Sequence, residues 1–178
     1  DGPLALDDCL ILVPTAQSAR RLRQGLADRA AGRGTAVLAP TVVTPEASLH
    51  LSPQARSLAS VLQARAVWEG VLRQVEPQEY PRLFPGVPAA QRSDRAWVAG
   101  TARLLTDLRE ALGERGLSIG AASTVLSDLL IDSHPAEAER WVDLAQLEER
   151  YLGRLDSHGL LDRTLAARAA AETGWIPE

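Results

Sequence analysis

Residues 9–40 read CLILVPTAQSARRLRQGLADRAAGRGTAVLAP, and three patterns follow one another in this stretch. The apolar run 9–13 is short, contains β-branched residues and ends at a proline, which is typical of a buried strand. Thr15 can cap the segment 16–30, where apolar residues recur every three or four positions until two glycines follow. Residues 35–39 form a second apolar run. The order strand, helix, strand predicts the opening of an open α/β sheet with a crossover helix.

The spacing of apolar residues is helical from Pro45 almost to the end of the chain. Pro45 follows Thr44, and a proline at the first helical position after a threonine cap is a common helix start. The segment 76–93 contains four prolines and is predicted to be a loop anchored by Tyr80 and Phe84. Three tryptophans fall on apolar stripes and are expected in the core: Trp68, Trp97 and Trp141. The stripes predict helices at 58–75, 97–112, 117–130, 141–155 and 162–172.

These patterns predict a mostly helical α/β protein in three parts. Residues 1–44 would begin an α/β domain, residues 45–172 would form an all-α subdomain inserted after its second strand, and residues 173–178 would return to it. The chain lacks an initiator methionine, and its last residues begin an apolar phrase without a cap. We therefore expect it to be a segment of a longer protein.

The composition excludes several classes of protein. All 19 basic residues are arginines, so the chain cannot contain a phosphate-loop lysine, a Schiff-base lysine or the lysine of a metal-dependent nuclease. No apolar run reaches the roughly 18 residues that a membrane span needs. Cys9 is the one cysteine, so no internal disulfide can form. We expect a cytoplasmic protein with no membrane contact.

Residues that could carry chemistry are sparse, and we predict no catalytic residue. The turn after the first strand has no glycine for a phosphate cradle. The histidines His50, His134 and His158 are far apart in sequence, which argues against a metal site. No G-x-S-x-G nucleophile turn occurs, and Cys9 is expected to be an inert core residue. The acidic pairs Glu137 with Glu139 and Glu148 with Glu149 are interpreted as a solvated helix face.

An arginine cluster is the feature that could bind a ligand. Arg20 and Arg21 lie in the first turns of the predicted helix, close to Thr15 and Ser18. Such a group could contact the phosphates of a nucleic-acid backbone. The alternative is that arginine replaces lysine on any solvated helix of this lysine-free chain. The net charge of −4 counts mildly against a dedicated nucleic-acid-binding domain.

Two phrases of the sequence resemble a known family. Residues 10–22, LILVPTAQSARRL, are similar to the segment just after the ATP-binding loop in AddB-type helicase–nucleases and related PD-(D/E)XK nuclease family proteins. Residues 38–49, LAPTVVTPEASL, resemble the next strand and threonine-containing turn of that family. Three further stretches look like its helical insertion, at 80–85, 141–152 and 159–162.

The resemblance implies a superfamily-one helicase-like region, which is the start of a P-loop-NTPase (RecA-like) sheet with an inserted all-α subdomain. In such helicases, the residues after the first strand and the threonine turn touch the backbone of single-stranded DNA. Carried over to this sequence, Thr15 and Thr44 become contact candidates, with Ser18 as a weaker third. Arg20 and Arg21 join them on electrostatic grounds alone.

The implied function is that of a non-catalytic segment in DNA double-strand-break repair and recombination. It would bind or guide single-stranded DNA while a PD-(D/E)XK nuclease elsewhere in the parent chain cuts, with an AddA-like helicase subunit as a partner. The ATP-binding loop and the nuclease motif are absent from this sequence. We expect no cofactor in this segment, with Mg²⁺ and ATP use left to the parent. The alternative is a helical protein–protein interaction scaffold without nucleic-acid contact.

Overall fold

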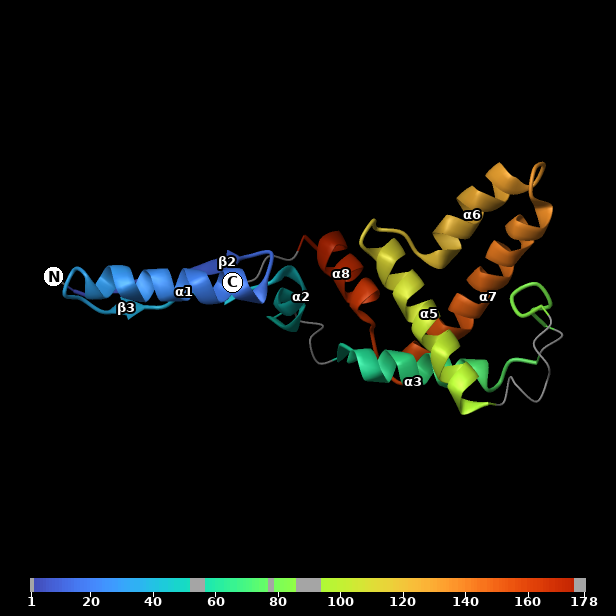
Figure 1. Cartoon of the computed structure of the whole chain (residues 1–178), viewed down its shortest axis with the longest axis horizontal. Coiled ribbons are helices and arrows are strands. Elements are labelled where there is room, and N and C mark those ends of the chain that lie inside the picture. The colour runs from blue at the N-terminus through green and yellow to red at the C-terminus, as the bar shows by residue number, and fades with distance from the viewer. Residues whose placement is uncertain (1, 52–56, 77–78, 86–93, 175–178) are drawn as a thin grey trace. The chain divides into compact units, whose positions relative to one another are not determined.

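The computed structural model describes residues 2–51, 57–76, 79–85 and 94–174 (Figure 1). It is mostly helical with small parallel two-stranded sheets, which confirms the predicted mostly helical α/β class. Contacts divide the chain into two compact units. The first, here the α/β unit, comprises residues 1–56 and 169–178, and the second, the helical unit, comprises residues 57–168. No described helix is both long and apolar enough to cross a membrane.

Four short strands and one long helix build the α/β unit. They are β1 Leu4–Ala5, β2 Leu10–Leu12, α1 Ala16–Ala31, β3 Val37–Leu38 and β4 Thr41–Val43. The strands β2 and β4 are parallel, and β1 is parallel to β3. α1 contacts both β3 and β4 and buries Ala19 and Ala30. The strand–helix–strand order is therefore confirmed, with α1 as the crossover.

The two predicted strands do not pair with each other. The run 35–39 contains β3, but β3 pairs with β1, a strand the sequence analysis missed, and the partner of β2 is β4. Pro40, between β3 and β4, has no N–H to donate to a ladder, so it divides one extended segment into two strands. Backbone hydrogen bonds from Leu6 to Leu38 and from Thr41 to Cys9 continue the pairing on both sides of this break.

The helix predicted to start at Pro45 is short. α2 covers Pro45–Ser48 and is followed by a 3₁₀ turn, η1, at Leu49–Leu51. The Ser48 hydroxyl donates to the Pro45 carbonyl at 2.7 Å, a local side-chain bond that competes with continued helix formation.

The helical unit contains the helices that the apolar stripes predicted. Its first four are α3 Val61–Leu72, α5 Arg95–Gly113, α6 Ile119–Leu130 and α7 Pro135–Ser157, and α8 Arg163–Glu172 carries the chain out of it. α6 runs beside α7, and α3 packs against α5 and α7 (Figure 1). Polar side chains cap three of the starts, at Ser60, Asp94 and Ser118, which supplies acceptors for backbone N–H groups at each helix end.

The core of the helical unit is centred on a stacked aromatic pair. The rings of Trp68 and Tyr151 are parallel with centroids 4.1 Å apart, and neither side chain reaches solvent. Tyr80 is buried too, and Phe84 packs edge-on against Trp97, so these two aromatics anchor the loop as predicted. The predicted loop 76–93 is described only at 76 and 79–85, so its parts at 77–78 and 86–93 lie outside the described residues.

The two ends of the helical unit lie side by side. Leu58 forms a parallel β-bridge with Leu161. The Ala59 N–H donates to the Leu161 carbonyl and the Leu161 N–H donates to the Ser57 carbonyl, both at 2.7 Å. The chain thus enters this unit beside the segment that leads into α8, the helix by which it leaves.

A buried ionic cluster, here the arginine network, joins four segments of the helical unit. Arg109 on α5 is 3% exposed, and its Nε donates to Asp162 at 2.5 Å while its Nη1 donates to Glu148 on α7. Tyr151 donates its hydroxyl to Asp162 at 3.1 Å. Burial opposes the charge of Arg109, but the hydrogen bond and charge of Asp162, with the charge of Glu148, still raise the pKa of Arg109.

Both carboxylates of the arginine network also cap helices. Glu148 accepts from the N–H groups of Ile119 and Gly120 at 3.1 and 2.8 Å, at the start of α6. Asp162 accepts from the Leu165 N–H at 2.9 Å, at the start of α8. Helix N-termini stabilise negative charge, so two carboxylates can share one arginine in the interior. The expectation that Glu148 lies on a solvated face was wrong, because these N–H groups and Arg109 draw it inside.

Replacing Arg109 by an uncharged residue should destabilise the helical unit. We expect Arg109→Met to lower the free energy of unfolding by about 3–5 kcal/mol, because two buried carboxylates lose their common partner. Arg103→Met is the matched control, since Arg103 lies on the same helix, is exposed and pairs only loosely with Asp107. The control should cost less than about 0.5 kcal/mol. Urea denaturation followed by tryptophan fluorescence measures both, and equal losses would refute the role assigned to the network.

Asp143 on α7 should make stability depend on pH. Its Oδ2 is buried without a hydrogen-bond partner among the described residues, and burial raises the pKa of its carboxyl. A raised folded-state pKa means that the folded protein binds the proton more tightly than the unfolded chain. The charged form therefore destabilises the fold at neutral pH, and this cost disappears as pH falls to the unfolded-state value near 3.8.

Asp143→Asn removes that titration. We expect the stability of the wild type relative to this variant to rise as pH falls from 7 towards about 4. Urea midpoints of the two proteins across this range provide the test. A difference that stays constant with pH would contradict the assignment, whatever its absolute value.

Candidate nucleic-acid interface

The carboxyl edge of the β2–β4 pair gathers the predicted binding residues. The register pairs Leu12 with Val43, so the two parallel strands end together. Thr44 follows Val43 directly, and Thr15 lies three residues beyond Leu12. In open α/β sheets, ligands bind outside the carboxyl ends of the strands. The structure therefore brings two threonines from distant sequence positions to one sheet edge.

Thr15 is the N-cap of α1. Its backbone is extended, and its Oγ1 accepts from the Ser18 N–H at 3.1 Å. The two hydroxyls of Thr15 and Ser18 lie 2.9 Å apart, with either as donor. Only one of the two hydroxyl hydrogens is used in that bond, so the other can be donated to a bound anion.

Thr44 plays the same local part for α2. Its half-buried side chain accepts from the Ala47 N–H at 3.3 Å. The cap uses a lone pair of the hydroxyl and leaves its hydrogen, for which the described part of the chain provides no acceptor. Capping and donation to a ligand are therefore compatible at both threonines.

α1 is strongly basic. Its sequence contains four arginines against one aspartate, and its first turn holds no acidic residue that could neutralise the helix N-terminus. Arg20 and Arg21 are exposed, and neither forms an ion pair with any described residue. Helical spacing places Arg21 one turn beyond Ser18 on the same side of α1, whereas Arg20, two residues from Ser18, projects from a different side of the helix.

The potential metal ligands of the described part of the chain do not form a cluster. Among residues 2–51, 57–76, 79–85 and 94–174, no group of three or more histidine, cysteine, aspartate or glutamate side chains is placed to hold a metal ion. His134 and His158 flank the two ends of α7, and His158 is its C-cap, as the helix dipole favours. His50 lies in η1.

Cys9 was wrongly expected in the core. The side chain is exposed just before β2, because the short strand begins only at Leu10. A hydrogen bond to Asp8, with the carboxylate charges of Asp8 and Asp7, raises the pKa of the thiol. A thiol held protonated in this way is a poor nucleophile at neutral pH, so exposure does not make Cys9 reactive.

Sequence reasoning missed two features of the helical unit: the arginine network and a basic hollow beside α7. Glu148 lies four residues after Leu144 and three before Tyr151, on the apolar stripe of α7. That position was the available sign that it is buried.

Comparisons with protein-family models, with curated proteins and with solved structures found no match to this chain.

Two substitutions at Thr15 test whether its side chain stabilises α1 as a helix cap. We expect Thr15→Ala to lower the stability of the α/β unit by about 1 kcal/mol, whereas Thr15→Asp should preserve it, because aspartate caps helices as well as threonine does. Gln17→Ala, in the exposed first turn, is the control and should be near neutral. Thermal unfolding by circular dichroism measures all three, and a neutral Thr15→Ala would contradict the capping role.

Proposed function

We propose that this chain is the helicase-like segment of an AddB-like, PD-(D/E)XK-containing DNA-repair protein, and that it holds single-stranded DNA. The observation that carries the proposal is the placement of Thr15 and Thr44 at one carboxyl edge of a parallel strand pair, beside the basic helix α1. This is the edge where the family resemblance expects backbone contacts.

Several groups at this edge suit a phosphodiester, although the first turn of α2 also holds the acidic Glu46. The N–H groups of Ala16 and Gln17 and one of the two hydroxyls of Thr15 and Ser18 can donate to phosphate oxygens. Arg20 and Arg21 supply charge without a competing ion pair. None of these groups reads a base edge, so the contact would be independent of DNA sequence.

The helical unit supports a helicase-like architecture. In the proposed RecA-like arrangement, an all-α subdomain interrupts the α/β sheet, and an insertion of that kind needs its entry and exit to be adjacent. The hydrogen bonds between 57–59 and Leu161 meet this requirement. Cutting, Mg²⁺ binding and any ATP hydrolysis would belong to other parts of the parent chain, with an AddA-like helicase subunit as its partner.

A second candidate function is a protein–protein interaction scaffold. It is favoured by large apolar side chains that face solvent on one helix, since Val125 and Leu129 of α6 are 56% and 69% exposed. These residues are four apart and so share a face of the helix. Apolar docking of this kind would change little with salt, in contrast to phosphate contacts.

Salt dependence tests the DNA-binding proposal. We expect the protein to bind labelled single-stranded DNA, measured by fluorescence anisotropy, with an affinity that falls steeply between about 20 and 200 mM salt. Each phosphate contact by an arginine contributes a slope of about −0.7, so Arg20→Gln with Arg21→Gln should remove about 1.4 from the slope. At the lower salt concentration, we expect this double variant to bind single-stranded DNA many-fold more weakly than the wild type.

Two further variants sharpen this test. Thr15→Asp keeps the cap and adds a negative charge at the proposed contact, so it should weaken binding without unfolding the protein. Arg103→Gln with Arg115→Gln removes the same charge from the middle of α5 and from the turn after it, and should leave the slope nearly unchanged. If wild-type protein fails to bind at low salt, or the control pair matters as much as Arg20 and Arg21, the proposed interface is wrong.

A further inference from the structure

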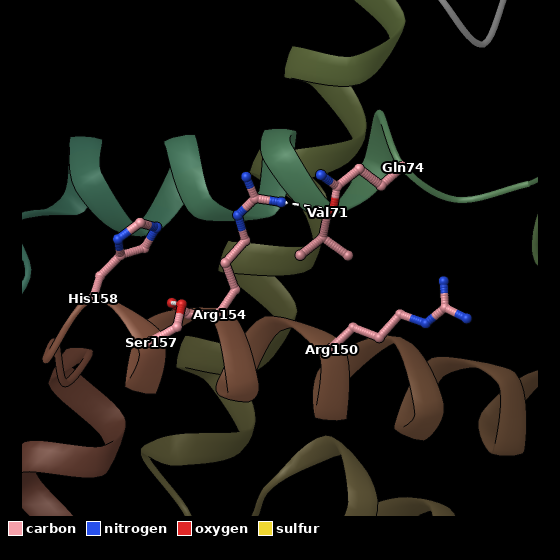
Figure 2. Close-up of a pocket in the computed structure, with 6 residues that line it drawn as sticks. All are labelled: Val71, Gln74, Arg150, Arg154, Ser157 and His158. Atoms are coloured by element: carbon pink, nitrogen blue, oxygen red, sulfur yellow. Dashed lines mark hydrogen bonds between the residues drawn. The ribbon is translucent and has the colours of Figure 1, made fainter.

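A hollow of about 500 Å³ lies between the end of α3 and the last turns of α7 (Figure 2). This volume is within the range of small-molecule sites. All of its lining residues belong to the helical unit, so it is separate from the threonine edge described above. They are Val71, Gln74, Arg150, Arg154, Ser157 and His158.

The two arginines of the hollow have different partners. Arg150 makes a bidentate ion pair with Glu79, at 2.9 and 3.1 Å, which neutralises it. Arg154 instead donates to the amide oxygen of Gln74 at 2.8 Å, as Figure 2 shows. No described carboxylate forms an ion pair with Arg154, and no carboxylate lines the hollow. The hollow therefore carries an uncompensated positive charge.

Gly70 on α3 makes room for this arginine. A Cβ at position 70 would lie 3.0 Å from Cζ of Arg154 and 3.2 Å from its Nε and Nη2. Glycine in the interior of a helix is less stable than alanine, so the position is unfavourable for α3 itself. The guanidinium thus rests directly on the α3 backbone, where a larger residue would displace it.

The remaining groups offer both donors and an acceptor. The Gln74 amide oxygen is used by Arg154, so its NH₂ group is left as a donor. The Ser157 hydroxyl donates to the Arg154 carbonyl at 2.8 Å, which leaves its oxygen as an acceptor. His158 reaches the other end of the hollow, and Val71 provides an apolar wall (Figure 2).

We propose that this hollow binds a phosphomonoester of about mononucleotide size, with Arg154 as its principal ligand. The guanidinium fork matches two phosphate oxygens, and the Gln74 amide and His158 can donate to a third. The Ser157 oxygen can accept from a hydroxyl of the ligand, and Val71 can contact its apolar part. The phosphomonoester could be a free nucleotide or the phosphorylated 5′ end of a DNA strand, since both present the same group.

Calorimetric titration of the whole chain tests this site. The probes are inorganic phosphate, deoxyadenosine monophosphate, and one oligonucleotide with and without a 5′-phosphate. We expect Arg154→Gln to weaken binding of the monophosphate at least tenfold. Gly70→Ala should weaken it several-fold without loss of thermal stability, since it keeps every charge and moves only the guanidinium. Arg140→Gln, an exposed arginine on the same helix that pairs with Glu137, should have no effect.

The outcomes separate this site from the strand contact. Binding of the monophosphate, or of the oligonucleotide only when it carries the 5′-phosphate, supports the proposal and identifies the source. The proposal fails if no probe binds the wild type up to about 10 mM, or if Gly70→Ala and Arg154→Gln bind as the wild type does. It fails also if Arg154→Gln weakens both oligonucleotides equally. Arg20→Gln with Arg21→Gln should leave monophosphate binding intact, so either proposal can fail alone.

Discussion

One buried arginine holds the helical unit together. Arg109 connects α5 to α7 through Glu148 and to the start of α8 through Asp162, over sequence separations of 39 and 53 residues. Each carboxylate then fixes the first turn of another helix, so a single cation sets the position of four. Such a cluster tolerates no partial arrangement, because any missing member leaves a charge buried and unpaired. Apolar packing alone would allow these helices to slide, whereas the network specifies one register.

The same cluster explains how the chain can return to its starting point after passing through the four described helices α3, α5, α6 and α7. Asp162 follows directly after Leu161, whose backbone is bonded to Ser57 and Ala59. The ionic network and the β-bridge therefore fix adjacent residues, one through side chains and one through the backbone. Trp68 stacks on Tyr151, which also donates to Asp162, so the aromatic core and the ionic cluster share a residue. Helix packing, the exit of the chain and the buried charge are thus parts of one arrangement.

The sequence predicted the features that depend on local interactions and missed those that depend on distant residues. Helices were found because their period and caps are local, as at Thr15 for α1 and the Gly113 end of α5. Strand partners were not predicted. A single proline lies between the two apolar runs that form β3 and β4, and nothing local marks β4 rather than β3 as the partner of β2. Glu148 sits in a run of charged residues and yet on the apolar stripe, and only the distant Arg109 and the α6 N-terminus make its burial favourable. Non-local electrostatics was the missing information.

The threonine edge combines local information with the non-local pairing of β2 and β4. A threonine after a strand caps the next helix, and two such strands paired in parallel bring both caps to the same edge. The capping roles of Thr15 and Thr44 were predictable from the sequence, whereas their placement at one edge required the β2–β4 pairing, and their contact with DNA stays a prediction. The hydroxyl of a cap residue accepts a hydrogen bond from the helix through its oxygen, and its hydrogen remains available to a ligand. Helix capping and donation to a ligand therefore use different atoms. α1, with four arginines against one aspartate, is a positively charged element in a chain of net charge −4, and Glu46 in the first turn of α2 is the acidic residue nearest to Thr44 in the sequence.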